Sequence, residues 1–145
     1  MSERTPRSVS DAMHAEDRVA QAMEMTIDSV SDGVAAVSMT VRDDMVNGLG
    51  VCHGGIVFTL ADTAMAHGSN AADERAFSTT AEIDWIEGAR LGDRLTATSS
   101  RISQRGRSSI HDIVVTNQSG ATVAVVRGRT LTVGGAVAPS RAAES

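Results

Sequence analysis

The pattern of hydrophobic and polar positions changes twice along this chain and marks out its main elements. Near the start, apolar residues recur at helical spacing and predict a helix over residues 11–23, capped by Ser10. Residues 56–66 form an apolar run rich in Ala, Leu and Met that lacks Pro and ends before Gly68, so we expect a second helix, buried on all sides. From residue 77 the period becomes two, which is typical of a strand with one buried face.

Six segments in all have the composition of strands joined by short turns. They are residues 25–30, 34–41, 77–86, 94–103, 108–116 and 121–132. Hairpin-joined strands around one long helix predict an α+β fold with an antiparallel sheet wrapped around that helix. A chain of 145 residues has room for one core, so we expect a single domain over residues 11–133, between a flexible N-terminus (1–10) and a flexible tail (134–145).

Composition and charge narrow the function classes and the compartment. The aromatic residues are two Phe and one Trp, so Val, Ala, Ile, Leu and seven Met must fill the core. A formal net charge of −5 argues against a general nucleic-acid binder. Cys52 is the single cysteine, which rules out an intrachain disulfide, and the N-terminal residues lack the apolar centre of a signal peptide. No run is long enough to span a bilayer, so we expect a cytoplasmic protein without membrane partners.

The stretch from Asn47 to Gly68 carries the candidate chemistry. His53-Gly54-Gly55 stands where the apolar helix begins, and a helix N-terminus without blocking side chains offers free N–H groups to a carbonyl oxygen or an anion. Asp62 is a carboxylate inside a mostly apolar element, which is costly unless the group is paired or functional. It lies eight residues beyond Gly54, about 12 Å along a helix, so the two groups meet most easily across a two-fold axis between two chains.

Four short segments together resemble one family, the phenylacetic-acid-degradation (PaaI-type) branch of the hotdog-fold acyl-CoA thioesterases. They are Asn47-Gly48, Cys52-His53-Gly54-Gly55, Leu60-Ala61-Asp62-Thr63-Ala64 and Gly106-Arg107-Ser108. The resemblance covers nearly the whole chain beyond the first twenty residues. It implies a hotdog fold that dimerises, with dimers pairing into a homotetramer, and hydrolysis of aryl-acyl-CoA, such as phenylacetyl-CoA or hydroxyphenylacetyl-CoA, in phenylacetate catabolism. It implies no cofactor.

The resemblance also implies catalytic roles for individual residues. Gly54 or Gly55 offers the N–H that polarises the thioester carbonyl, and Asp62 of the partner chain acts as general base or nucleophile. Asn47 orients the attacking water or the thioester, and His53 shapes the loop. Each also has a structural alternative: Gly54-Gly55 for close packing, His53 as a turn or cap residue, Asp62 as a buried structural carboxylate, and Asn47 as part of a turn dipeptide.

Substrate-binding residues are expected in three places. Thr63 follows the candidate acid, and Arg107 and Ser108 lie in a basic hairpin whose arginines suit the phosphates of coenzyme A. An adaptable apolar pocket wall is expected from Met39, Met45, Val46 and Met65. That wall suits an aryl group and also a medium alkyl chain. The segment 85–88 reads Trp-Ile-Glu-Gly where the family commonly has Arg-Pro, so coenzyme contacts are not expected to carry over there.

Other functions remain as alternatives at this level. A hotdog dehydratase or hydratase would carry an Asp-x-Asn-Pro-x-x-His signature, which the chain lacks. A non-catalytic acyl-CoA-binding module or a purely structural dimer would have little use for Asp62. A metal site is not expected, because only Asp62 and His67 have ligand-like spacing and no third ligand is evident. His67 itself is expected to be solvated or to cap the helix end.

Overall fold

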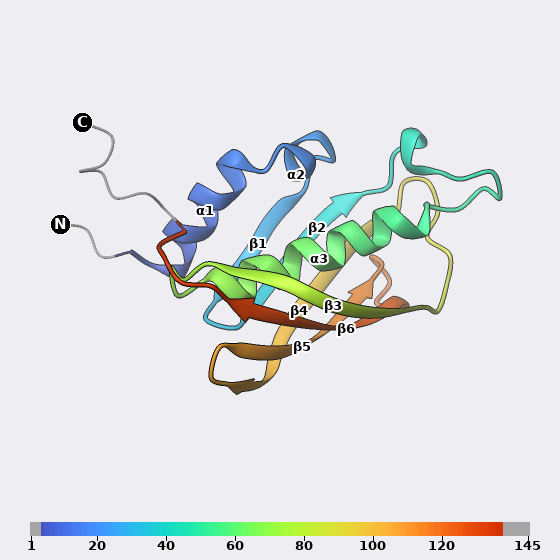
Figure 1. The fold of residues 1–145 in the computed structure, drawn as a ribbon. Helices are drawn as coiled ribbons and strands as arrows, with labels where there is room; N and C mark the ends of the chain where they lie inside the picture. Colours follow the sequence, from blue (N-terminus) through green and yellow to red (C-terminus); the bar gives the residue numbers. More distant parts are fainter. Residues whose placement is uncertain (1–3, 138–145) are drawn as a thin grey trace.

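A six-stranded antiparallel sheet curls around one long helix in the computed structural model, which describes residues 4–137 (Figure 1). The sheet order is β1-β2-β4-β5-β6-β3, so β1 and β3 form its edges. The elements in chain order are α1 (Pro6–Glu16), α2 (Arg18–Ala22), β1 (Thr26–Ser31), β2 (Val34–Thr40), the 3₁₀ helix η1 (Asp43–Met45), α3 (Gly54–Asn70), β3 (Ala76–Trp85), β4 (Arg94–Arg105), β5 (Ser108–Thr116) and β6 (Thr122–Thr132). The predicted α+β arrangement, with the sheet wrapped around the helix, is confirmed.

The core lies between α3 and the concave face of the sheet. Successive residues of a strand point to opposite faces, so alternate positions of β4 and β5 are buried against the helix. As the composition predicts, the core is built from aliphatic residues and methionine; its largest fully buried apolar side chains are Met39, Leu60, Met65, Leu95 and Ile113. A Cβ at Gly128 of β6 would collide with the sulfur of Met65, so glycine at this position lets the helix approach the sheet.

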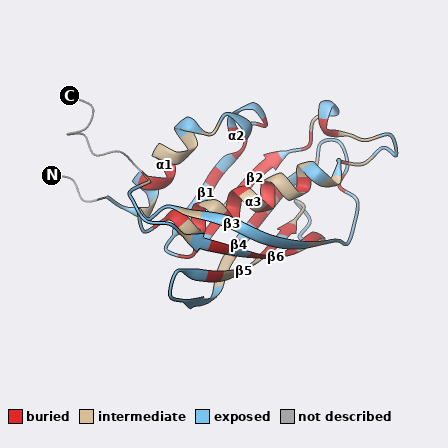
Figure 2. Ribbon diagram, viewed as in Figure 1, coloured by how far each residue is buried: buried red, intermediate tan, exposed pale blue. Residues whose placement is uncertain are grey.

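The central helix differs from the prediction in two respects. It continues through Gly68 to Asn70, because Gly68 serves close packing rather than helix termination: its carbonyl accepts the N–H of Gly33 at 3.0 Å, and a Cβ would lie 3.4 Å from the Gly33 backbone. The expectation of burial on all sides is also wrong for the single chain. One stripe of α3 is only partly buried (Figure 2); it contains Phe58, Thr59, Asp62, Ala66 and Ser69.

Strand β3 is more open than its alternating pattern predicts. None of its ten residues is fully buried, and Phe77 and Trp85 are 53% and 54% exposed. The reason is its place in the sheet, since β3 is an edge strand that pairs only with β6. The predicted buried face is therefore absent in the isolated chain.

The N-terminal helix begins earlier than the sequence predicts. Thr5, not Ser10, is the N-cap, because its hydroxyl accepts the N–H of Ser8 while the Ser8 hydroxyl accepts the N–H of Thr5. Pro6 favours the first helical position, and Asp17 then interrupts the helix and caps α2. Residues 6–10 of the expected flexible N-terminus thus belong to α1, whereas its residues 1–3 and residues 138–145 of the expected tail lie outside the described residues.

His67 is buried in the structure, which corrects the expectation of a solvated or capping residue. It is 1% exposed, and its Nδ1 lies 2.5 Å from the hydroxyl of Ser10 on α1. Burial is the main reason that the pKa of His67 falls to about 4, because a low-dielectric environment disfavours the charged ring. Among the described helices, none combines the length and the apolar character needed to cross a membrane.

Candidate active site

The loop before α3 is held by its own backbone and by the side chain of Asn47. The Asn47 amide oxygen accepts the N–H groups of Leu49 at 2.9 Å and Val51 at 3.3 Å, and an isolated bridge joins Val46 to Cys52. Asn47 therefore stabilises a turn, and this role uses only its side-chain amide oxygen. The Asn47 Nδ2 group pairs with nothing among residues 4–137, which leaves a donor beside the start of the helix.

His53 caps the N-terminus of α3. Its Nδ1 accepts the N–H of Gly55 at 3.2 Å, and its carbonyl accepts the N–H groups of Ile56 at 2.9 Å and Val57 at 3.2 Å. For the N–H of Gly54, no acceptor is present in the described part of the chain. Of the two glycines predicted to polarise a carbonyl, Gly54 therefore has the free donor, because the donor of Gly55 is taken by the cap.

Trp85 packs directly on this helix end, which the sequence did not lead us to expect. The indole Nε1–H donates to the Gly54 carbonyl at 3.1 Å, and a Cβ on Gly54 would lie 2.9 Å from the same nitrogen. Glycine at this position thus serves two purposes: it leaves space for the indole ring, and it keeps the N–H accessible. Two features of the sequence could have drawn attention to this residue: it is the only tryptophan of the chain, and it stands where the segment departs from the Arg-Pro pair of the family.

A cavity of about 200 Å³ opens at this helix end. Its lining combines the loop, the first turns of α3 and the segment after β3: Asn47, Val51, Cys52, Gly54, Val57, Trp85, Ile86, Glu87, Gly88, Ala89 and Val123. The wall is mostly apolar, with the amide of Asn47 and the carboxyl of Glu87 as its polar side chains. Burial raises the pKa of the Cys52 thiol, which keeps it protonated and argues against a thiolate nucleophile.

Asp62 lies outside this cavity in the same chain. It stands on the partly buried stripe of α3, and the hydroxyl of Ser78 on β3 donates to its Oδ1 at 3.1 Å. Eight residues of helix, about 12 Å, separate it from Gly54. Thr63, the next residue, is buried and donates its hydroxyl to the Thr59 carbonyl at 2.7 Å. The structure thus brings Asn47, His53 and Gly54 together and holds Asp62 and Thr63 apart from them.

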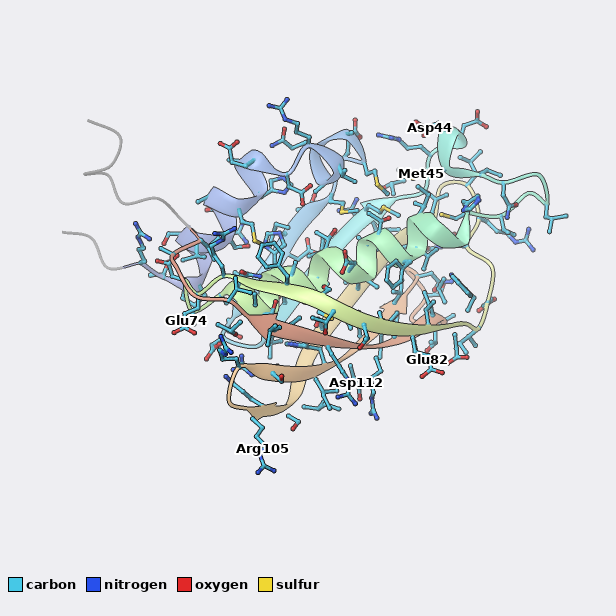
Figure 3. The ribbon with its side chains drawn as sticks, viewed as in Figure 1. Asp44, Met45, Glu74, Glu82, Arg105 and Asp112 are labelled. Carbon is cyan, nitrogen blue, oxygen red and sulfur yellow. The ribbon has the colours of Figure 1, made fainter. Side chains whose placement is uncertain are left out.

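The remaining predicted substrate contacts also lie away from the cavity. Arg107 and Ser108 belong to the β4–β5 hairpin, which pairs with the end of β6 beside the start of β3, whereas Gly54 lies beside the end of β3. Figure 3 shows Arg105 of this hairpin and Met45 at opposite ends of the molecule. The hairpin and the cavity therefore lie at different ends of β3 in this chain.

The expected methionine wall is wrong for this cavity. Met39, Met45 and Met65 are 0–3% exposed and belong to the core, and Val46 packs against that core. The segment from Trp85 to Ala89 provides the wall instead. In the part of the chain that the structure describes, no group of three or more His, Cys, Asp or Glu residues is arranged to hold a metal ion.

Comparison with known proteins places this geometry in a family. The family model described as "Thioesterase superfamily" matches residues 49–124. The acyl-coenzyme A thioesterase PaaI of Escherichia coli K12 is 39% identical over 126 residues, which cover 87% of this chain and 90% of that protein. The family model thus covers the second part of the loop, all of α3 and strands β3 to β5, and it begins two residues after Asn47.

Solved structures agree with the sequence relatives. The structure of the E. coli PaaI protein from the phenylacetic acid degradation operon has a TM-score of 0.89 at 37% identity, covering 90% of this chain and 95% of that one. A Streptococcus mutans protein solved with acetyl CoA bound has a TM-score of 0.73 at 26% identity, covering 76% and 89%. The predicted hotdog fold and the resemblance to PaaI-type proteins are confirmed, and the chain belongs to the thioesterase superfamily.

Proposed function

We propose that the chain is an acyl-CoA thioesterase whose oxyanion site is the N–H of Gly54. The observation that carries the proposal is this donor, left free at a helix N-terminus that opens into an apolar cavity. Developing negative charge on a thioester oxygen is stabilised by a donor that is already in place and by the positive end of the helix dipole. The related E. coli protein is named an acyl-coenzyme A thioesterase, and the S. mutans protein holds acetyl CoA.

In the proposed reaction the thioester carbonyl accepts the Gly54 N–H, and Asn47 Nδ2 holds the attacking water or the thioester. As general base, Asp62 takes a proton while water adds to the carbonyl carbon. The C–S bond then breaks, and the thiolate of coenzyme A leaves and is protonated. As nucleophile, Asp62 would itself form the new C–O bond, and water would release the acid in a second step. Both routes end in free acid and coenzyme A.

The positions of Asp62 and Gly54 support a site shared between two chains. The stripe of α3 that carries Asp62 is partly open, and the neighbouring edge strand β3 exposes Phe77 and an unpaired backbone edge. A second copy with its α3 antiparallel would cover both features and bring its Asp62 toward Gly54. We therefore propose a homodimer as the catalytic unit, which pairs into a homotetramer and works in the cytoplasm.

Phenylacetyl-CoA and its ring-hydroxylated relatives are the proposed substrates. The support is the named E. coli relative from the phenylacetic acid degradation operon, together with a mostly apolar cavity that includes an indole ring. A medium-chain acyl-CoA is the second candidate, because most of the other side chains in the wall are aliphatic.

A pair of variants at one position tests the oxyanion role. Gly54→Pro removes the N–H at the first helical position, where proline is favoured, and His53 (φ −56°, ψ 132°) already has the extended conformation of a residue before proline. Gly54→Ala is the matched control, because it introduces the same Cβ against Trp85 but keeps the N–H. Thiol release from phenylacetyl-CoA should be slower by about 10²–10³ in kcat for the Pro variant than for the Ala variant. Equal rates in two folded variants would refute the role of this donor.

Mixed dimers test whether the site is shared. An Asp62→Asn chain should lose about 10²–10⁴ in kcat as a homodimer. Purified heterodimers of this chain with a Gly54→Pro chain contain one intact site if Asp62 and Gly54 come from different chains, and should recover about half of the wild-type activity. If both groups act within one chain, each site of the heterodimer carries a defect and no activity returns.

A further inference from the structure

The side chain of Trp85 has no role in the chemistry described above, yet it forms one face of the cavity. It is the last residue of β3, it is 54% exposed, and its indole is anchored by the Nε1–H bond to the Gly54 carbonyl. Ring atoms Cε2 and Cζ2 lie over Gly54, where an added Cβ would approach them to 3.0 and 3.3 Å. The flat ring therefore lies beside the N–H proposed to bind the thioester oxygen.

The rest of the cavity contributes shape rather than specific recognition. Apart from Cys52, its other apolar lining residues are aliphatic or glycine, and Glu87 is its one charged residue. A cavity of about 150 Å³ lined by apolar side chains holds benzene, so about 200 Å³ is enough for one aromatic ring and a methylene. Aliphatic walls accept aryl and alkyl groups alike, whereas an aromatic face favours a second aromatic ring through offset or edge contacts.

We propose that Trp85 determines acyl specificity: its ring face packs against an aryl group joined to the thioester through a short linker, and so favours aryl-acyl over alkyl-acyl substrates. The anchoring hydrogen bond keeps the ring in this orientation when the cavity is empty, so little side-chain freedom is lost on binding. The inference rests on the proposed thioesterase activity and assigns the selectivity of that site to one residue.

Selectivity is tested by the ratio of kcat/KM for phenylacetyl-CoA to that for hexanoyl-CoA. Trp85→Leu keeps an apolar side chain and removes the aromatic face, so this ratio should fall by about threefold to tenfold. Trp85→Phe keeps an aromatic face without the Nε1–H and should retain most of the ratio. Val19→Ala on α2 is the control: it shortens an apolar side chain of similar exposure that neither lines the cavity nor lies on the β3 edge, and the ratio should stay unchanged.

Several outcomes would overturn the assignment. A fall in kcat/KM that is equal for both substrates would refute the specificity role, because it would assign Trp85 to the coenzyme or to the position of Gly54 rather than to the acyl group. An unchanged ratio in an active Trp85→Leu enzyme would refute the specificity role while leaving the thioesterase activity in place. If the wild-type enzyme released no thiol from any acyl-CoA, the proposed function itself would be refuted.

Fluorescence supplies a readout that needs no substitution at Trp85. The chain contains one tryptophan, so its emission reports on this ring alone. In an Asp62→Asn background, which slows turnover, phenylacetyl-CoA should change the intensity or wavelength of the emission. Hexanoyl-CoA and free coenzyme A should change it much less. An equal change with coenzyme A alone would place the coenzyme, not the aryl group, against the indole and would refute the inference.

Discussion

Acidification should destabilise this protein through His67, a buried residue between α3 and α1. Burial lowers the pKa of His67 to about 4 from its ordinary value of 6.5. The unfolded chain therefore binds a proton as the pH falls through 6.5, while the folded chain takes one up only near pH 4. Unfolding is favoured progressively over this interval. The stabilisation due to the neutral ring is complete above about pH 6.5 and lost by about pH 4.

The size of the effect follows from the two pKa values. At about 1.4 kcal/mol for each pKa unit, the gap between 6.5 and about 4 corresponds to a loss of about 3 kcal/mol, of which about 2 kcal/mol is reached at pH 5. Neighbouring charges modify the burial effect. His14 and Arg7 lower the pKa of His67 further, and Asp17 and Asp11 oppose them. A change of about 2 kcal/mol is a large share of the stability of a typical domain.

Urea denaturation at pH 7.5 and pH 5.0 measures this loss, with His67→Gln as the matched variant. The variant loses the hydrogen bond with Ser10 and should be less stable at pH 7.5, but its free energy of unfolding should fall by about 2 kcal/mol less between the two pH values. Some pH dependence will remain, because burial also lowers the pKa of His111. The same decrease in both proteins would refute the assignment to His67.

Three further predictions concern assembly and the site. Sedimentation at micromolar concentration should show a dimer or tetramer, and a fully active monomer would contradict the shared site. Arg107→Ala should raise KM for acyl-CoA more than it lowers kcat, because a phosphate contact remote from the carbonyl contributes mainly uniform binding; an equal rise in KM for a short acyl-thiol substrate would contradict this role. Ser78→Ala should lower kcat about threefold to tenfold with KM nearly constant, because it removes the hydrogen bond that holds the carboxylate of Asp62. The control Thr79→Ala, on the same strand, should have little effect. A Ser78→Ala change in KM alone would argue against that positioning.

The sequence by itself determined the class of fold and the position of the helix N-terminus that we propose as the active site. Alternation of period two and the turns at residues such as Gly33 and Gly106 are local signals, which is why all six strands appear within a few residues of their predicted positions. The His53-Gly54-Gly55 segment likewise predicted a helix N-terminus, because capping depends on neighbours in the chain.

Only the tertiary structure decided the contacts between residues that are far apart in the sequence. Whether Gly68 ends a helix or lets another backbone approach depends on Gly33, which is 35 residues away and pairs with it. His67 is buried because α1 covers it, and Trp85 reaches Gly54 because β3 runs past the start of α3. Burial and contact are properties of elements packed together. A single helix or strand pattern carries no information about which element will cover it, and only the folded chain supplies that partner.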